Sequence, residues 1–175
     1  MAPLAIELGR REGIKSQICV TAQHREMLDG VLAVFGLRPD YDLDIMRPGQ
    51  TLADITSRVL SGLGAVFESA KPDLVLVHGD TTTTFAAALA AFYSKLGCGH
   101  VEAGLRTFDR WSPYPEEMNR RLAGQLCTLH FAPTARNAEN LRREGVEGGV
   151  FITGNTVIDA LAYTARGEGF SSGEL

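Results

Sequence analysis

Acidic residues follow two neighbouring strands that the sequence predicts between residues 71 and 107. The apolar runs 73–77 and 98–101 each lead into a loop, with Asp80 after the first run and Glu102 after the second. Because parallel strands bind ligands outside their carboxyl ends, we expect both acids to face one crevice. Glu116, at the start of a later helix, brings a third carboxylate to the same rim. Such a group of acids suits general acid–base catalysis on a polar, sugar-like substrate.

Each acid also has a purely structural explanation. For any single acid, the structural and the catalytic explanations are equally well supported. Asp80 is suited to capping the helix that follows it, Glu102 to pairing with Arg106, and Glu116 to the positive end of its helix dipole. Arg106 and Arg120 lie near the acids in the sequence. They could neutralise these carboxylates or hold an anionic substrate.

Four histidines lie in or at the ends of expected strands. His24 and His78 stand at carboxyl ends, which makes them the better candidates for binding or catalysis, whereas His100 and His130 are expected to pack in the core. No Cys/His spacing is typical of a metal site, and we expect none. The three cysteines lie in or beside apolar runs and are expected to be buried free thiols of a cytoplasmic protein.

Composition and missing motifs narrow the class of protein. The chain has 175 residues, a net charge of −4 and no basic run, so we expect no nucleic-acid partner. No apolar stretch is long enough to span a membrane, and no signal peptide is recognisable. Neither GxGxxG nor a Walker motif is present, so we expect no dinucleotide or other cofactor.

The elements that must position these residues alternate between strand and helix. This pattern predicts a Rossmann-like parallel α/β domain over residues 1–165 and a flexible tail over 166–175. The chain begins with a helix where a doubly wound fold normally begins with a strand, and that first strand would lie near the sheet centre. We expect strands at 17–21, within 39–46, and at 73–77, 98–101, 129–132 and 149–153, and helices at 2–11, 27–35, 52–70, 85–95, from 115, at 135–144 and at 156–165.

Seven segments, in order, carry a resemblance to a known family: TAQHREMLDGVL, PDYDLDIM, KPDLVLVHGDTTTTFAAALAAFY, GHVEAGLRT, SPYPEEMNR, HFAPT and TGNTVIDAL. Over about residues 1–161 the chain closely resembles the bacterial non-hydrolysing UDP-N-acetylglucosamine (UDP-GlcNAc) 2-epimerases. The combination of HGDTTTT, HVEAGLRT and PEEMNR is highly specific for that family.

The resemblance implies an isomerase that interconverts UDP-GlcNAc and UDP-ManNAc without NAD or metal. It also implies two Rossmann-like domains in the GT-B arrangement, a homodimer, and a product used for cell-envelope polysaccharides. By motif, the family's three carboxylates fall on Asp80, Glu102 and Glu116. Gln23 and His24 match a segment associated in some members with a regulatory UDP-GlcNAc.

The chain also departs from the family. Members open with a strand and a Gly-Thr-Arg-Pro-Glu loop, and they carry a second, UDP-binding domain; neither is present here. We therefore expect an N-terminal fragment that is inactive alone. The alternatives are a hydrolysing epimerase, a related epimerase of a modified sugar, and a non-catalytic truncated α/β module.

Overall fold

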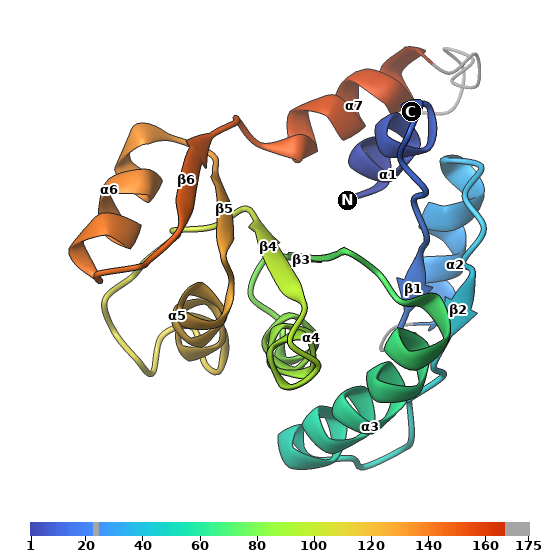
Figure 1. Cartoon of the computed structure of the whole chain (residues 1–175), viewed down its shortest axis with the longest axis horizontal. Coiled ribbons are helices and arrows are strands. Elements are labelled where there is room, and N and C mark those ends of the chain that lie inside the picture. Colours follow the sequence, from blue (N-terminus) through green and yellow to red (C-terminus); the bar gives the residue numbers. More distant parts are fainter. Residues whose placement is uncertain (23–24, 167–175) are drawn as a thin grey trace, which may run out of the picture.

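The computed structural model describes residues 1–22 and 25–166, in which helices and strands alternate along the chain (Figure 1). Gln23, His24 and the part of the expected tail beyond Arg166 lie outside the described residues. The elements are α1 (Ala2–Gly9), β1 (Cys19–Val20), α2 (Arg25–Val34), β2 (Tyr41–Asp42), α3 (Leu52–Ala70), β3 (Leu74–His78), α4 (Thr82–Tyr93), β4 (Gly97–Val101), α5 (Glu116–Leu126), β5 (Leu129–Ala132), α6 (Ala135–Arg143), β6 (Gly149–Ile152) and α7 (Thr156–Arg166).

The strands form two parallel sheets. Strand β1 pairs with β2, and a separate sheet of four strands has the order β3-β4-β5-β6, with helices packed on it. In Figure 1 the two sheets lie on either side of an interval between β1 and β3. The predicted Rossmann-like parallel fold is therefore confirmed, with its sheet divided in two.

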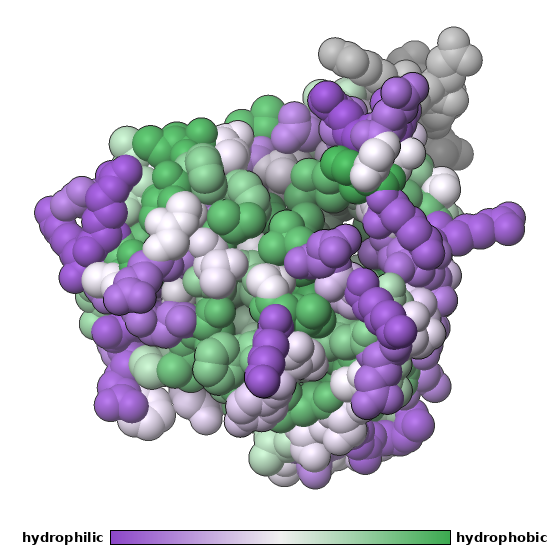
Figure 2. Space-filling model, in the orientation of Figure 1, coloured by the Kyte–Doolittle hydropathy of each residue, from purple (hydrophilic) through white to green (hydrophobic). Residues whose placement is uncertain are grey.

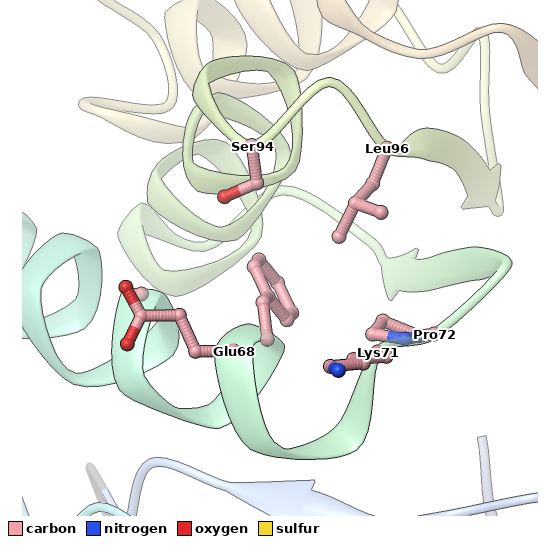
Figure 3. A pocket seen from close by; sticks show the side chains of 7 residues that line it. Glu68, Lys71, Pro72, Ser94 and Leu96 are labelled. Atoms are coloured by element: carbon pink, nitrogen blue, oxygen red, sulfur yellow. The ribbon is translucent and has the colours of Figure 1, made fainter.

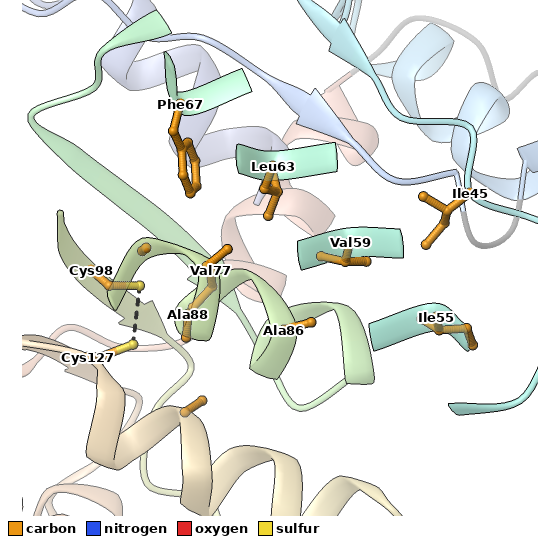
Figure 4. Close-up of a cluster of buried hydrophobic side chains, with 13 residues drawn as sticks. Ile45, Ile55, Val59, Leu63, Phe67, Val77, Ala86, Ala88, Cys98 and Cys127 are labelled. Atoms are coloured by element: carbon orange, nitrogen blue, oxygen red, sulfur yellow. Dashed lines mark hydrogen bonds between the residues drawn. The ribbon is translucent and has the colours of Figure 1, made fainter. Parts of the chain in front are cut away.

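Helix α3 shows how the sequence builds the core. Thr51 and Asp54 form a capping box at its start, each side chain accepting a backbone N–H of the other. Its buried residues recur at helical spacing and pack against α4 and β3 (Figure 4). The helix ends at Lys71, whose φ of +47° is left-handed. The buried α3 residues are Ile55, Val59, Leu63 and Phe67.

Two expectations differ from the structure. The second strand lies at Tyr41–Asp42, just before the predicted inward residues; Leu43 is half-buried and Ile45 is buried. Cys19 is exposed, because successive side chains of β1 point to opposite faces and Val20 takes the buried one, whereas Cys98 and Cys127 are buried as expected.

The surface is mixed in character. On the face shown in Figure 2, hydrophobic residues occupy much of the middle and hydrophilic residues gather at the sides. Helix α7 packs on α1 and exposes Val157, Ile158 and Leu161. Within the described part of the chain, no helix is long and apolar enough to cross a bilayer.

Candidate active site

The end of β3 and the loop after it are held in place by bonds to His78, Gly79 and Thr81. The Thr84 hydroxyl donates to the His78 carbonyl at 2.6 Å, and His100 Nε2 donates to the Gly79 carbonyl at 2.7 Å. Thr81 caps α4 by accepting the Thr84 N–H. Gly79 has a φ of +73°, a conformation that glycine adopts without steric cost. These contacts fix the backbone that carries His78 and Asp80.

Helix α5 reaches back to Asp80 through two side chains. Arg120 Nη2 lies 3.0 Å from Asp80 Oδ2, and Asn119 Nδ2 donates to the Asp80 carbonyl at 3.0 Å. Arg120 is nearly buried, while about a third of the Asp80 side chain is exposed. The Arg120 Nε also donates to the Glu116 carbonyl. The Asp80 carboxylate is thus positioned by α5 and still reaches solvent.

Glu102 occupies a strained position at the end of β4. Its φ of +65° lies in the left-handed region, which a glutamate rarely adopts and which costs free energy unless the surroundings impose it. Those surroundings include the next residues: the Ala103 N–H donates to the Phe131 carbonyl, and Asn140 donates to the Gly104 carbonyl at 3.0 Å. These bonds fix the backbone after β4, from which the Glu102 side chain reaches His78 at the carboxyl edge of the sheet.

Glu102 and His78 meet at this edge. His78 Nε2 lies 3.5 Å from Glu102 Oε2, and both side chains are partly exposed. Burial lowers the pKa of His78, against the opposing charges of Glu102 and Asp80. The result is a neutral imidazole beside carboxylates, able to donate or accept a proton.

The two glutamates that open α5 differ sharply. Glu116 is half-buried at the first helical position. Glu117 is fully buried and accepts the backbone N–H groups of Thr107 and Phe108 at 3.1 and 3.2 Å. Glu117 therefore holds the loop before the helix. Its position in the sequence, next to Glu116, gave no sign of this role.

Arg106 does not form the ion pair expected for it. Its side chain is fully buried and forms two bonds to Glu144, at 2.9 and 2.6 Å, so it pairs with neither Glu102 nor Glu116. In this structure the guanidinium of Arg106 ties the loop after β4 to Glu144 at the end of α6, so the expected pairing with Glu102 is not formed, and its role in binding substrate stays a prediction. Arg120 is the arginine that contacts a rim acid, Asp80.

The structure thus places three of the predicted residues, His78, Asp80 and Glu102, at one sheet edge. Glu116 opens α5, the helix whose Arg120 reaches Asp80, and we call these four residues the rim. Among the described residues, no group of His, Cys, Asp or Glu has the geometry of a metal site. Two shallow hollows lie elsewhere: one at the amino end of β3 and β4, lined in part by Glu68, Lys71 and Leu96 (Figure 3), and one on the outer face of α5.

Comparison with known sequences identifies relatives over almost the whole chain. A family model described as UDP-N-acetylglucosamine 2-epimerase matches residues 6–170. The UDP-N-acetylglucosamine 2-epimerase of Escherichia coli K12 is 56% identical over 100% of this chain and 46% of its own length. The enzyme of the same name from Bacillus subtilis is 55% identical, over 98% of this chain and 45% of its own length.

Solved structures give the same result. The crystal structure of UDP-GlcNAc 2-epimerase from Neisseria meningitidis bound to UDP-GlcNAc has a TM-score of 0.90 at 57% identity, covering 93% of this chain and 44% of that one. The Methanocaldococcus jannaschii enzyme in complex with UDP-GlcNAc and UDP has a TM-score of 0.86 at 37% identity, over 95% of this chain and 47% of that one. The chain spans under half the length of these relatives, and it belongs to the UDP-N-acetylglucosamine 2-epimerase family.

Proposed function

We propose that this chain supplies the acid–base half of an enzyme that interconverts UDP-GlcNAc and UDP-ManNAc by inverting C2. The observation that carries the proposal is the rim itself. His78 and Glu102 lie 3.5 Å apart, and Asp80 is held nearby by Arg120. Structures of relatives that contain UDP-GlcNAc support the choice of substrate.

The rim supports proton transfer at a carbon next to a leaving group. A carboxylate takes the proton from C2 while the C1–O bond to UDP breaks, and a C1–C2 double bond forms, giving 2-acetamidoglucal. Return of a proton to the other face of C2 and of UDP to C1 completes the inversion. Neutral His78 can pass the proton to or from Glu102, whereas Asp80 is held by Arg120 and Asn119.

In this proposal residues 1–165 form one domain, and a second domain binds most of the uridine and diphosphate. The rim is rich in acids, which repel a diphosphate, so the cations that hold it must come largely from elsewhere. We propose that the complete enzyme is a cytoplasmic homodimer, and that Gln23 and His24 take part in binding a regulatory nucleotide sugar. The 175-residue chain alone is then expected to show no turnover.

The test is solvent exchange at C2. A full-length protein that carries this sequence is incubated with UDP-GlcNAc in deuterated water, and both epimers are analysed by NMR. We expect deuterium at C2 of each epimer, because the proton removed from C2 mixes with solvent at the exposed rim. Epimerised product that keeps its original hydrogen at C2 would contradict proton transfer and would indicate hydride chemistry or cleavage of another bond.

A further inference from the structure

Each backbone carbonyl of the turn at residues 78–80 accepts a hydrogen bond from a buried side chain, and the three donors come from α4, β4 and α5. The donors, in the order of the carbonyls that they reach, are Thr84, His100 and Asn119. Helix α4 follows the turn in the chain, and β4 pairs with β3. Of the three donors, only Asn119 reaches the turn from α5, the helix that Glu116 opens.

The Asp80 carbonyl lies just outside the hydrogen bonding of α4. Thr81 is the N-cap of that helix, and its carbonyl accepts the first helical bond, from the Phe85 N–H at 3.2 Å. The Asp80 carbonyl comes one residue earlier and takes its donor from Asn119 Nδ2, at 3.0 Å. The same Nδ2 lies 3.5 Å from the hydroxyl of Thr82, the first residue of α4. Asn119 therefore contacts both the end of the turn and the start of the helix.

Burial makes this contact consequential. Asn119 and Thr82 are 6% and 7% exposed, between α4 and α5, which lie side by side (Figure 1). When a buried hydrogen bond is lost, water does not readily take the place of the missing partner, so the group left behind must move or stay unsatisfied. The Asn119 amide is thus a fixed link between α5 and the backbone of Asp80.

Asn119 and Arg120 hold Asp80 in different ways. Arg120 Nη2 pairs with the Asp80 carboxylate at 3.0 Å, so it acts on the charge of that group as well as on its place. Asn119 is neutral and bonds to the main chain, so it acts on place alone. Glu116 lies three residues before Asn119, about one turn of the same helix. The bond therefore fixes the backbone of one rim acid against the helix that begins with another.

We propose that Asn119 is a positioning residue for the reaction: its bond to the Asp80 carbonyl sets where the Asp80 carboxylate stands relative to α5, and it thereby acts on turnover rather than on substrate binding. The kinetic part of this inference rests on the proposed function. A displacement of about 1 Å at a reacting group can lower a rate about a hundredfold. His100 and Glu117 are also buried, but they bond to Gly79 and to the loop before α5, not to a rim residue.

The experiment uses a full-length protein that carries this sequence. Asn119→Leu removes the donor and keeps a side chain of similar size, whereas Asn119→Gln keeps an amide that can still donate. Phe67→Leu, in the core beside the hollow at the amino end of β3 and β4, is the control for a general loss of stability. Each change is made alone and together with Asp80→Asn. The kcat and KM for UDP-GlcNAc are measured, with amide hydrogen exchange over residues 79–84.

Asn119→Leu should lower kcat by about 10–100-fold and change KM by less than about threefold, because the carboxylate is displaced while the groups that bind the substrate remain. Asn119→Gln should restore kcat to within about fivefold of the unaltered enzyme. In the Asp80→Asn background, Asn119→Leu should cost less than about a further threefold, since it acts through the carboxylate that is already lost. Phe67→Leu should leave kcat within about threefold in either background.

Hydrogen exchange supplies a readout that does not depend on the reaction. The amides of residues 79–84 should exchange at least about fivefold faster in Asn119→Leu and at an unchanged rate in Phe67→Leu. If the unaltered protein does not epimerise UDP-GlcNAc, the proposed function fails, and the role of Asn119 is then decided by this exchange. Four results would overturn the inference: a kcat of Asn119→Leu within threefold of the unaltered enzyme, a loss confined to KM, an equal loss in the Asp80→Asn background, or unchanged exchange of the turn.

Discussion

The rim and the layer directly behind it contain the same kinds of residue in different states. At the rim, His78 and Glu102 are partly exposed and lie 3.5 Å apart. Behind it, His100 and Glu117 are completely buried, and each is bonded to backbone. A buried and bonded side chain fixes the loops, whereas an exposed one at the same edge remains available to a ligand. Exposure, rather than residue type, separates the two roles.

The two arginines divide in the same way. The Arg106 side chain is fully buried and pairs with Glu144. Arg120, by contrast, pairs with Asp80, whose side chain is about a third exposed. Both form short contacts with a carboxylate, so pairing alone does not identify a site residue. Substitutions that act on activity at the rim and on stability behind it would test this division.

The largest effect is expected for amide substitutions at the rim. In a full-length protein, Asp80→Asn, Glu102→Gln or Glu116→Gln should lower turnover by about two to four orders of magnitude, because each removes a charge or a proton carrier. The melting temperature should change little. Steady-state kinetics beside thermal unfolding would measure both, with Glu139→Gln on the exposed face of α6 as the control. If a variant keeps a rate within a few fold of the unaltered enzyme but loses stability sharply, that residue has a structural role like those of His100 and Glu117.

A smaller effect, on stability instead of turnover, is expected for Arg106→Met. Removing the fully buried guanidinium leaves Glu144 with Arg121 alone, at 3.4 Å, and should lower the free energy of unfolding by about 3 kcal/mol. Arg142→Met, at an exposed position paired with Glu139 at 3.9 Å, should cost about 0–1 kcal/mol. Urea unfolding compares the two variants. Equal losses would show that the Arg106 pair contributes no more than a surface contact.

The smallest effect is the pH dependence contributed by His100. Burial lowers the pKa of His100 to about 4, against the opposing bond to Gly79. As the pH falls through about 6.5 the unfolded chain takes up a proton that folded His100 does not, so its contribution to stability should decrease by about 2 kcal/mol between pH 7 and pH 5. His100→Asn should flatten that part of the stability–pH profile, measured by urea unfolding. An unchanged slope would mean that His100 titrates alike in both states.

Most of the fold could be predicted because its signals are local. Strand 129–132 and helix 52–70 were predicted at their observed bounds, from a short apolar run and from apolar residues at helical spacing. Strands β1 and β2 are only two residues long, and their pairing depends on Asp40 and Tyr41 meeting Ile18 across the chain. No local pattern encodes a bond of that kind, so their bounds were the least accurate.

The site was predictable only in part, for a similar reason. The carboxyl ends of β3 and β4 placed His78, Asp80 and Glu102 correctly, since topology alone sets that edge. The partners of Asp80, by contrast, come from Asn119 and Arg120, almost forty residues later. The burial of Glu117 and Arg106 could not be predicted, because burial of a charged residue depends on which distant element covers it.

The contact between Cys98 and Cys127 gives the chain a built-in reporter of unfolding. The two buried sulfurs lie 3.3 Å apart, and their hydrogen bond and burial raise the pKa of Cys127, so neither thiol should react with an alkylating reagent while the core is closed (Figure 4). Cys19 is exposed, but desolvation and the charge of Asp42 raise its pKa to about 11, so it should label slowly in the folded chain. A mass spectrum taken after a brief maleimide pulse would therefore separate folded molecules, with at most one adduct, from opened ones, with three.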